Sequence, residues 1–517
     1  MRLTPLFGVS EERLKAEVAS LAPSAPGPLP DLSVYYYVDA PDEKLDSLAE
    51  RLRQQPSIAA AYVKPPAEPA AVAQAQIVLN DMLPLPEDAP PVTANFTSRQ
   101  IYLNPAPAGI DAYYAWALPG GRGAGVNIID CEWAWRFTHE DLLANQGGII
   151  SGVQTGDDNH GTAVLGEFHG NQNSFGVTGI ASDSFVRSSS FSLPTSTAIY
   201  NAANLLRPGD IILLEIHRPG PRATGVGQQG FIAIEWWPDD YDAIRYAASR
   251  EILVVEAAGN GAQNFDDPVY NTPAAGFPAS WSNPFRRGNR DSGAILVGAG
   301  APPPGTHGRD WGPDRSRLDF SNYGAAVDVQ GWGREVTSTG YGDLQGGLSR
   351  DVWYTDQFSG TSSASPIIVG TLACVQGVLR AQGRIPLSPA RARDLLRSTG
   401  SPQQDAPGRP ATQRIGNRPN LRQLIPGALQ TATFAGVQFR GTIPASATQR
   451  WFTFNWPAQW HVAWTVVPTS PHAGAPQIRW RVQVERASFG FITYWINITN
   501  LTAFPVDIEA RYDVLGW

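Results

Sequence analysis

Four short, almost uninterrupted apolar runs constrain the fold of this chain more than any other feature. They are VNIID (126–130), DIILLEI (210–216), EILVVEAAG (251–259) and AILVGAG (294–300). Strands that are apolar on both faces are typical of parallel sheets, because helices cover both sides of such sheets. Helical patterns such as YDAIRYAASR (241–250) lie between the runs. The sequence therefore predicts an α/β domain with a mainly parallel sheet over residues 100–426.

The segment before this domain has a mixed pattern. Strand-like SVYYYV (33–38) and IAAAYV (58–63) flank a stretch in which leucines repeat at helical spacing. This pattern predicts a small α+β domain over residues 1–80. The Pro- and Ala-rich composition that follows is typical of a linker, which we assign to residues 81–99.

The last part of the chain, residues 427–517, changes to a period of two. Apolar residues alternate there with Thr493, Trp495, Asn497 and Thr499; the apolar positions are Ile492, Tyr494, Ile496 and Ile498. Alternating segments separated by turn residues predict an antiparallel β-sandwich.

Composition excludes several kinds of chemistry. Lys15, Lys44 and Lys64 are the only lysines, so Schiff-base lysines, Ser–Lys dyads and P-loops have no place in the rest of the chain. The net charge of -8 comes without a basic run, which argues against a nucleic-acid partner. Two cysteines, Cys131 and Cys374, cannot form a disulfide scaffold, and we expect Cys131 to be a buried thiol.

The sequence also bears on the compartment. No apolar run reaches the roughly 18 residues that a membrane-spanning helix needs, so we expect no transmembrane segment. The beginning, MRLTPLFGVSEERLKAEV, lacks the continuous apolar core of a secretory signal. We therefore expect synthesis in the cytoplasm, and export without a signal peptide stays open.

Four short segments carry candidate catalytic side chains. Asp130 ends the first apolar run, where α/β folds place their sites, although a helix-capping role would also explain it. His160 opens the small-residue helical pattern HGTAVLG. Asn260 lies in AAGNG, whose glycines leave room for a ligand, although Asn-Gly is also a common turn. Ser362, in GTSSASP, precedes a helix whose unpaired N–H groups favour an oxyanion, and a plain helix cap is the alternative.

Taken in chain order, these residues supply an orienting acid, a general base, an oxyanion donor and a nucleophile. GTSSASP, HGTAVLG, AAGNG and IIDCEWAWRFTHEDL resemble the motifs of the subtilisin-like serine proteases, peptidase family S8, over residues 100–426. The resemblance implies a subtilisin-like three-layer α/β fold and a serine endopeptidase that forms an acyl-enzyme on Ser362. His160 would take the serine proton, Asp130 would fix the imidazole, and Asn260 with the Ser362 N–H would hold the oxyanion. Sedolisins, with a glutamate in place of the histidine, are a rival because of Glu132, but the HGT motif argues against them.

The resemblance also implies residues that bind substrate and metal. The substrate-binding positions are Glu215, Ile216, Ala258 and Gly259. Glu215, together with Asp157 and Asp158 near His160, would favour basic residues in the substrate, unless these are simply solvated acids. No cofactor is expected for catalysis, but a structural calcium ion is expected on Gln100, Asp141 and Asn173, because oxygen ligands suit that ion.

The α+β segment at the N-terminus resembles the propeptide of the same family. IAAAYVKP is similar to the last strand of such a propeptide. The resemblance implies a zymogen in which the N-terminal domain is an intramolecular inhibitor, with a maturation cut between residues 70 and 100. An ordinary accessory domain is the alternative.

The expected partner of the site is a protein or peptide substrate, and two further function classes stay open. One is a non-catalytic binding protein on a protease fold, which could use the Trp-rich C-terminal sandwich. The other is a peptide ligase or cyclase with the same acyl-enzyme, because the sequence does not separate hydrolysis from aminolysis.

Overall fold

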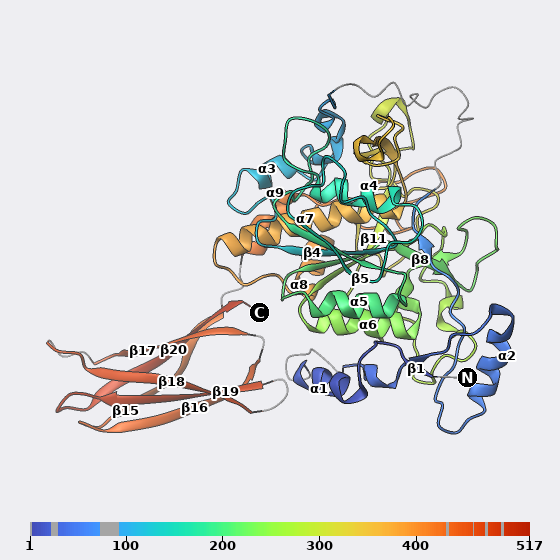
Figure 1. Ribbon diagram of the computed structural model, residues 1–517. Helices are drawn as coiled ribbons and strands as arrows, with labels where there is room; N and C mark the ends of the chain where they lie inside the picture. Colours follow the sequence, from blue (N-terminus) through green and yellow to red (C-terminus); the bar gives the residue numbers. More distant parts are fainter. Residues whose placement is uncertain are drawn as a thin grey trace. The chain divides into compact units, whose positions relative to one another are not determined.

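The computed structural model describes residues 3–21, 29–72, 92–430, 434–458, 460–470, 474–487 and 491–516 (Figure 1). The chain divides into two compact units. One comprises Met1–Glu11 and Leu32–Ala428, and the other comprises Glu12–Asp31 and Leu429–Trp517. Residues 81–91 of the predicted linker lie outside the described residues.

A seven-stranded sheet with the order β12-β11-β10-β7-β4-β6-β5 forms the centre of the first unit, and all its neighbouring strands are parallel. Its strands are β4 (Asn127–Glu132), β5 (Gln146–Ser151), β6 (Phe185–Ser190), β7 (Ile211–Leu214), β10 (Leu253–Ala257), β11 (Ile295–Gly300) and β12 (Val329–Trp332). The four apolar runs of the sequence form β4, β7, β10 and β11, which are almost wholly buried. The predicted α/β class is confirmed.

Helices cover both faces of this sheet (Figure 1). Helices α5 (Thr195–Asn204) and α6 (Pro238–Ser249) pack on one face, and α4 (Asn159–His169) and α7 (Thr361–Ala381) pack on the other. Among the described residues α7 alone is long and apolar enough to cross a membrane, and it is entirely buried in the protein. Its apolar composition is therefore that of a core helix. The shorter helices α3 (Ala112–Trp116), α8 (Pro389–Ser398) and all but the last residue of α9 (Leu421–Leu429) also belong to this unit.

Two small sheets border the region around Ser362. Strands β13 (Val336–Thr339) and β14 (Tyr354–Phe358) form an antiparallel pair. Strands β3 (Glu68–Pro69), β8 (Ile216–Pro219) and β9 (Phe231–Ile232) form a second antiparallel sheet, in which β8 is central. A segment from the N-terminal part of the chain is therefore hydrogen-bonded directly to the α/β domain.

The N-terminal part differs from its prediction in both strands, and the first is reduced to two residues because Leu32–Val34 form a 3-10 turn. Helix α2 (Asp42–Arg53) is present as expected, and β2 (Tyr36–Tyr37) pairs with β1 (Thr4–Pro5) within the predicted first strand. The strand predicted at 58–63 does not form. Instead Ala61 donates its N–H to the carbonyl of Gly276, so this segment is bonded to a loop of the α/β domain. Helix α1 (Glu11–Leu21) lies mostly in the second unit.

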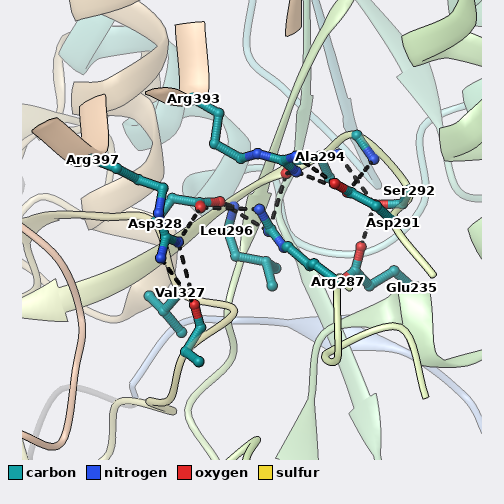
Figure 2. A network of polar contacts seen from close by, with 12 residues as sticks. Glu235, Arg287, Asp291, Ser292, Ala294, Leu296, Val327, Asp328, Arg393 and Arg397 are labelled. Atoms are coloured by element: carbon teal, nitrogen blue, oxygen red, sulfur yellow. Dashed lines mark hydrogen bonds and ion pairs between the residues drawn. The ribbon is translucent and has the colours of Figure 1, made fainter. Parts of the chain in front are cut away.

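A network of partly buried charges around the fully buried Asp328 ties α8 to the sheet (Figure 2). Asp328, fully buried just before β12, accepts hydrogen bonds from Arg287 at 3.0 Å, from Arg397 of α8 at 2.7 Å and from the Leu296 N–H at 3.0 Å. Arg393, one turn earlier on α8, pairs with Asp291. A carboxylate can be buried here because Oδ1 accepts hydrogen bonds from both guanidinium groups, while Oδ2 accepts the Leu296 N–H and lies 2.9 Å from Arg287 Nη2.

The second unit contains the predicted antiparallel sandwich. Its two three-stranded sheets have the orders β15-β20-β17 and β16-β19-β18. The strands are β15 (Phe434–Ile443), β16 (Thr448–Pro457), β17 (His461–Pro468), β18 (Ile478–Arg486), β19 (Phe491–Asn500) and β20 (Val506–Gly516). Tyr494, Ile496 and Ile498 of β19 are buried as their alternation predicts.

Candidate active site

Ser362 is the second residue of α7 and is fully buried. Gly360, just before the helix, has a φ of 125°, a conformation that residues with a side chain rarely adopt. A Cβ at Gly360 would lie 2.3 Å from the carbonyl oxygen of Ala70, so the glycine also lets another segment approach closely. The G-T-S sequence therefore places the serine hydroxyl at a helix N-terminus, beside N–H groups that the helix leaves unpaired.

His160, in the first turn of α4, connects Ser362 to an acidic residue. Its Nε2 lies 2.9 Å from Ser362 Oγ, and its Nδ1 contacts Oε1 of Glu132. Burial lowers the pKa of His160 to about 4, so the imidazole is an uncharged base at neutral pH. When Nε2 accepts the serine proton in a hydrogen bond, the single ring proton is on Nδ1 and is donated to Glu132.

The acid beside His160 is thus Glu132, and the prediction that Asp130 orients the imidazole is wrong. Asp130 Oδ2 instead accepts a hydrogen bond from the indole Nε1 of Trp135, at 2.6 Å. Both carboxylates lie on β4, where residues two apart project from the same face. Glu132 is the last residue of the strand, and only its side chain reaches the imidazole. Burial raises the pKa of both carboxyls, and the charge of Glu132 raises that of Asp130 further.

Asn260 and the backbone of Ser362 converge on one carbonyl oxygen. Asn260 Nδ2 donates to the oxygen of Ala70 at 2.6 Å, and the Ser362 N–H donates to the same oxygen at 3.2 Å. Asn260 Oδ1 accepts from both the N–H and the hydroxyl of Thr361, each at 2.9 Å. These bonds fix which end of the amide faces Ala70. Two aligned donors at one carbonyl oxygen form the arrangement that stabilises an oxyanion.

The carbonyl in this position belongs to a segment that runs across the site, residues 68–72. Before Ala70, Glu68 and Pro69 pair in antiparallel register with His217 and Ile216 of β8. After it, Ala71 bridges to Gly360, and the Val72 N–H donates to the Ser359 carbonyl at 3.2 Å. The chain is therefore bound on both sides of Ser362, with the Ala70–Ala71 peptide bond at the serine.

Of the four predicted substrate positions, Ile216 is the one that pairs with this segment among the contacts described. This pairing is through the backbone, and Ala258 and Gly259 directly precede Asn260. Glu215 is fully buried, and burial together with the charge of Asp130 raises the pKa of its carboxyl. We therefore do not place Glu215 among the residues that contact substrate.

The other acids that suggested a basic substrate already have arginine partners within the chain. Asp158 pairs with Arg136 at 2.8 Å and with Arg350 at 2.5 Å, and Asp157 pairs with Arg350 at 2.6 Å. These ion pairs compensate the negative charge that was expected to attract lysine or arginine side chains.

Comparison with known proteins agrees with this geometry. The model of the subtilase family matches residues 150–418, which is more than half of the chain. The chain belongs to the subtilase family. The matched range contains His160, Asn260 and Ser362 but begins after Asp130 and Glu132, so the identity of the orienting acid rests on the geometry.

Curated relatives of this subtilase include proteases of bacteria. An intracellular serine protease of Paenibacillus polymyxa is 26% identical over 298 residues, covering 54% of this chain and 75% of the relative. Subtilisin BL of Lederbergia lenta is 28% identical over 265 residues, covering 50% of this chain and 77% of the relative. This subtilase is a serine peptidase.

Among solved structures, the chain is similar to a protease from Pseudoalteromonas arctica, with a TM-score of 0.45 and 20% identity over 65% of this chain and 99% of the other. It is also similar to the prenylagaramide maturation protease PagA, with a TM-score of 0.41 and 19% identity over 62% of this chain and 97% of the other.

The residues predicted to hold calcium in this subtilase do not fit that ion. Asp141 accepts hydrogen bonds from Asn173 Nδ2 at 2.6 Å and from the Val177 N–H at 2.7 Å, so its two oxygens already face donors. Gln100 bonds both the N–H and the carbonyl of Thr178 through its amide. Calcium needs six to eight oxygen ligands around one point, whereas these side chains bond to protein N–H groups and to separate partners.

Two functional features were missed from the sequence. From the sequence, Glu132 was considered only as a sign of a sedolisin. Its position at the end of the strand could have indicated that its carboxyl, rather than that of Asp130, lies nearest the helix that contains His160. The second feature is the segment 68–72, whose short AEPAAV sequence has no pattern that distinguishes it from the neighbouring Pro- and Ala-rich stretch.

Proposed function

We propose that this subtilase is a serine endopeptidase whose catalytic residues are Ser362, His160, Glu132 and Asn260. The observation that carries the proposal is the 2.9 Å contact between His160 Nε2 and Ser362 Oγ, next to two donors that share one carbonyl oxygen. A nucleophile in contact with a neutral base, beside a formed oxyanion site, is equipped for acyl transfer.

In this mechanism Ser362 Oγ forms a bond to the carbonyl carbon while its proton moves to His160 Nε2. The carbonyl oxygen becomes an oxyanion, which Asn260 Nδ2 and the Ser362 N–H stabilise. The C–N bond then breaks as Nε2 returns the proton to the leaving amine. Water repeats the sequence on the ester, which releases the acid and restores the serine.

Glu132 has the orienting role in this scheme. Its carboxylate accepts a hydrogen bond from Nδ1–H, so that the proton stays on Nδ1 and Nε2 is free to accept the proton of Ser362. It also stabilises the positive charge that forms on the ring during the attack. Asp130 has no direct part, because its hydrogen bond goes to Trp135.

We further propose that the chain is a zymogen that cuts its own Ala70–Ala71 bond. The Ala70 carbonyl accepts from both oxyanion donors, and residues on either side pair with β8 and with the strand that leads to Ser362. A segment held in this way blocks access to the serine until it is cut. Cleavage would leave a carboxylate on Ala70 and a new amino terminus on Ala71.

A fluorophosphonate probe tests the nucleophile. We expect the purified protein to be labelled on Ser362, and Ser362→Ala to abolish labelling, whereas Ser363→Ala, which changes the next serine, keeps it. Labelling that persists in Ser362→Ala would exclude the proposed nucleophile.

The intact mass and the N-terminal sequence test the self-cleavage. We expect a chain that begins at Ala71, and we expect Ser362→Ala to keep residues 1–70 covalently attached. A serine-dependent new terminus at any residue other than Ala71 would refute the bond assignment and leave the peptidase proposal standing.

A further inference from the structure

The bound segment 68–72 also indicates which substrates the active site prefers. The preference follows from a chain of hydrogen bonds that begins at the backbone N–H of Thr361. The Thr361 N–H can only donate, so the Asn260 atom that faces it at 2.9 Å is Oδ1. The Asn260 Nδ2 therefore faces the other way and donates to Gln228 Oε1 at 3.0 Å. This leaves the Gln228 NH₂ group pointing at the segment.

Gln228 lies in the loop between β8 and β9 and contacts two positions of the segment. One hydrogen of Nε2 is donated to the carbonyl of Pro69, at 3.1 Å. Burial raises the pKa of the neighbouring Glu68 carboxyl, and a hydrogen bond with the Gln228 side chain opposes part of that rise. Because the orientation of the amide is fixed by Asn260, Gln228 offers only donors to the side chain at position 68.

His217 presents a second donor to the same position. The Asn260 N–H donates to His217 Nδ1 at 3.1 Å, so the neutral ring has its proton on Nε2. That Nε2 is buried and lies 3.9 Å from Glu68 Oε1. Burial lowers the pKa of the ring to about 3, and the Pro69 carbonyl, a backbone acceptor beside it, raises it in part. A buried donor gains from a strong acceptor, and an acidic side chain at position 68 can supply one with a small movement.

We propose that Gln228 and His217 form a subsite that selects an acidic residue two positions before the residue whose carbonyl is attacked. The inference rests on the proposed function, and Glu68, Pro69 and Ala70 of the chain define the register. The preferred substrates are peptides with glutamate or aspartate at that position. This preference is opposite to the basic one that the acids of the sequence suggested.

The subsite makes a definite prediction for peptide cleavage. Three fluorogenic peptides are compared that contain AEPAAV, AQPAAV or AKPAAV and are otherwise identical. Hydrogen bonds to a charged acceptor are stronger than those to a neutral one, so we expect kcat/KM for the glutamate peptide to exceed that for the glutamine peptide about tenfold. The lysine peptide should be the poorest, because both subsite groups can only donate.

Variants of Gln228 test the assignment, with the protein as purified and its active sites counted by phosphonate labelling. Gln228→Met removes both N–H donors of the Gln228 amide while nearly preserving the size of the side chain. It should reduce the preference for the glutamate peptide severalfold. Gln228→Glu should favour the lysine peptide. Gln229→Met, a change at the exposed next residue, should keep the wild-type preference.

The outcomes separate the two proposals. Equal kcat/KM for the glutamate and glutamine peptides in a protein that labels normally would overturn the subsite and leave the peptidase proposal intact. A glutamate preference that Gln228→Met does not change would also overturn the role of Gln228. Absence of both labelling and cleavage would overturn the proposed function, and this inference with it.

Discussion

Replacing Glu132 by glutamine is the sharpest test of the active-site geometry, because the sequence favoured a different acid. Glu132 contacts His160 Nδ1, whereas Asp130 bonds to Trp135. A glutamine keeps the size of the side chain but removes its charge. If its NH₂ group faces Nδ1, the ring proton must move to Nε2, which then cannot accept the proton of Ser362.

The expected decrease in kcat follows from two losses: the correct tautomer of His160 and the negative charge that stabilises the protonated ring. Amide replacement of the orienting acid in a serine-protease triad lowers kcat by about 10⁴, so we expect a similar loss for Glu132→Gln. Asp130→Asn is the matched control, since an asparagine oxygen can still accept the Trp135 indole N–H. We expect that variant to lose less than about tenfold, because Asp130 touches no reacting group.

The assay is kcat on a fluorogenic AEPAAV peptide, corrected for active sites by phosphonate labelling, with circular dichroism to check that each variant is folded. Self-cleavage followed by intact mass gives a second, independent readout. A large loss in Asp130→Asn with near-normal activity in Glu132→Gln would refute the assignment of the acid and restore the one drawn from the sequence.

Further predictions concern the oxyanion site, pH, calcium and stability. Asn260→Ala should lower kcat by about 10²–10³ with little change in KM, and an unchanged kcat would remove Asn260 from the site. Burial lowers the pKa of His160 from 6.5 to about 4, so the base is neutral above that value. The rate of self-cleavage should therefore hold from pH 7 to about pH 5 and fall through about pH 4, and a midpoint near 6.5 would contradict this. Because Asp141 already bonds to protein donors, EGTA should leave the Tm of the protein unchanged, and a marked drop would restore the calcium site. Asp328→Ala should cost about 1–3 kcal/mol of unfolding free energy in urea, measured in the Ser362→Ala background, because it leaves the buried Leu296 N–H without its acceptor and two partly buried arginines without their acid. A cost below about 1 kcal/mol would show that the network in Figure 2 adds little.

Much of the active site could be predicted because it is encoded in short stretches of sequence. Gly360, Thr361 and Ser362 place a hydroxyl at the start of α7, and His160 begins a small-residue helix. Asn260 lies three residues after the end of the buried strand β10. Each of these arrangements depends on local backbone preferences and on which face of a helix or strand is apolar and therefore buried. Both can be recognised in the sequence.

The sequence by itself thus determined the α/β architecture, the sandwich and three of the four proposed catalytic residues. Only the tertiary structure decided between Asp130 and Glu132. The two carboxylates lie on the same face of β4, so periodicity treats them alike, and the distance to a histidine on another element separates them. Only the tertiary structure also shows the path of residues 68–72. This segment pairs with β8 and contacts the oxyanion donors, which lie far from it in the sequence. Such long-range pairing depends on which strand edges and hydrogen-bond donors remain unpaired in the folded domain. A local sequence pattern does not contain that information.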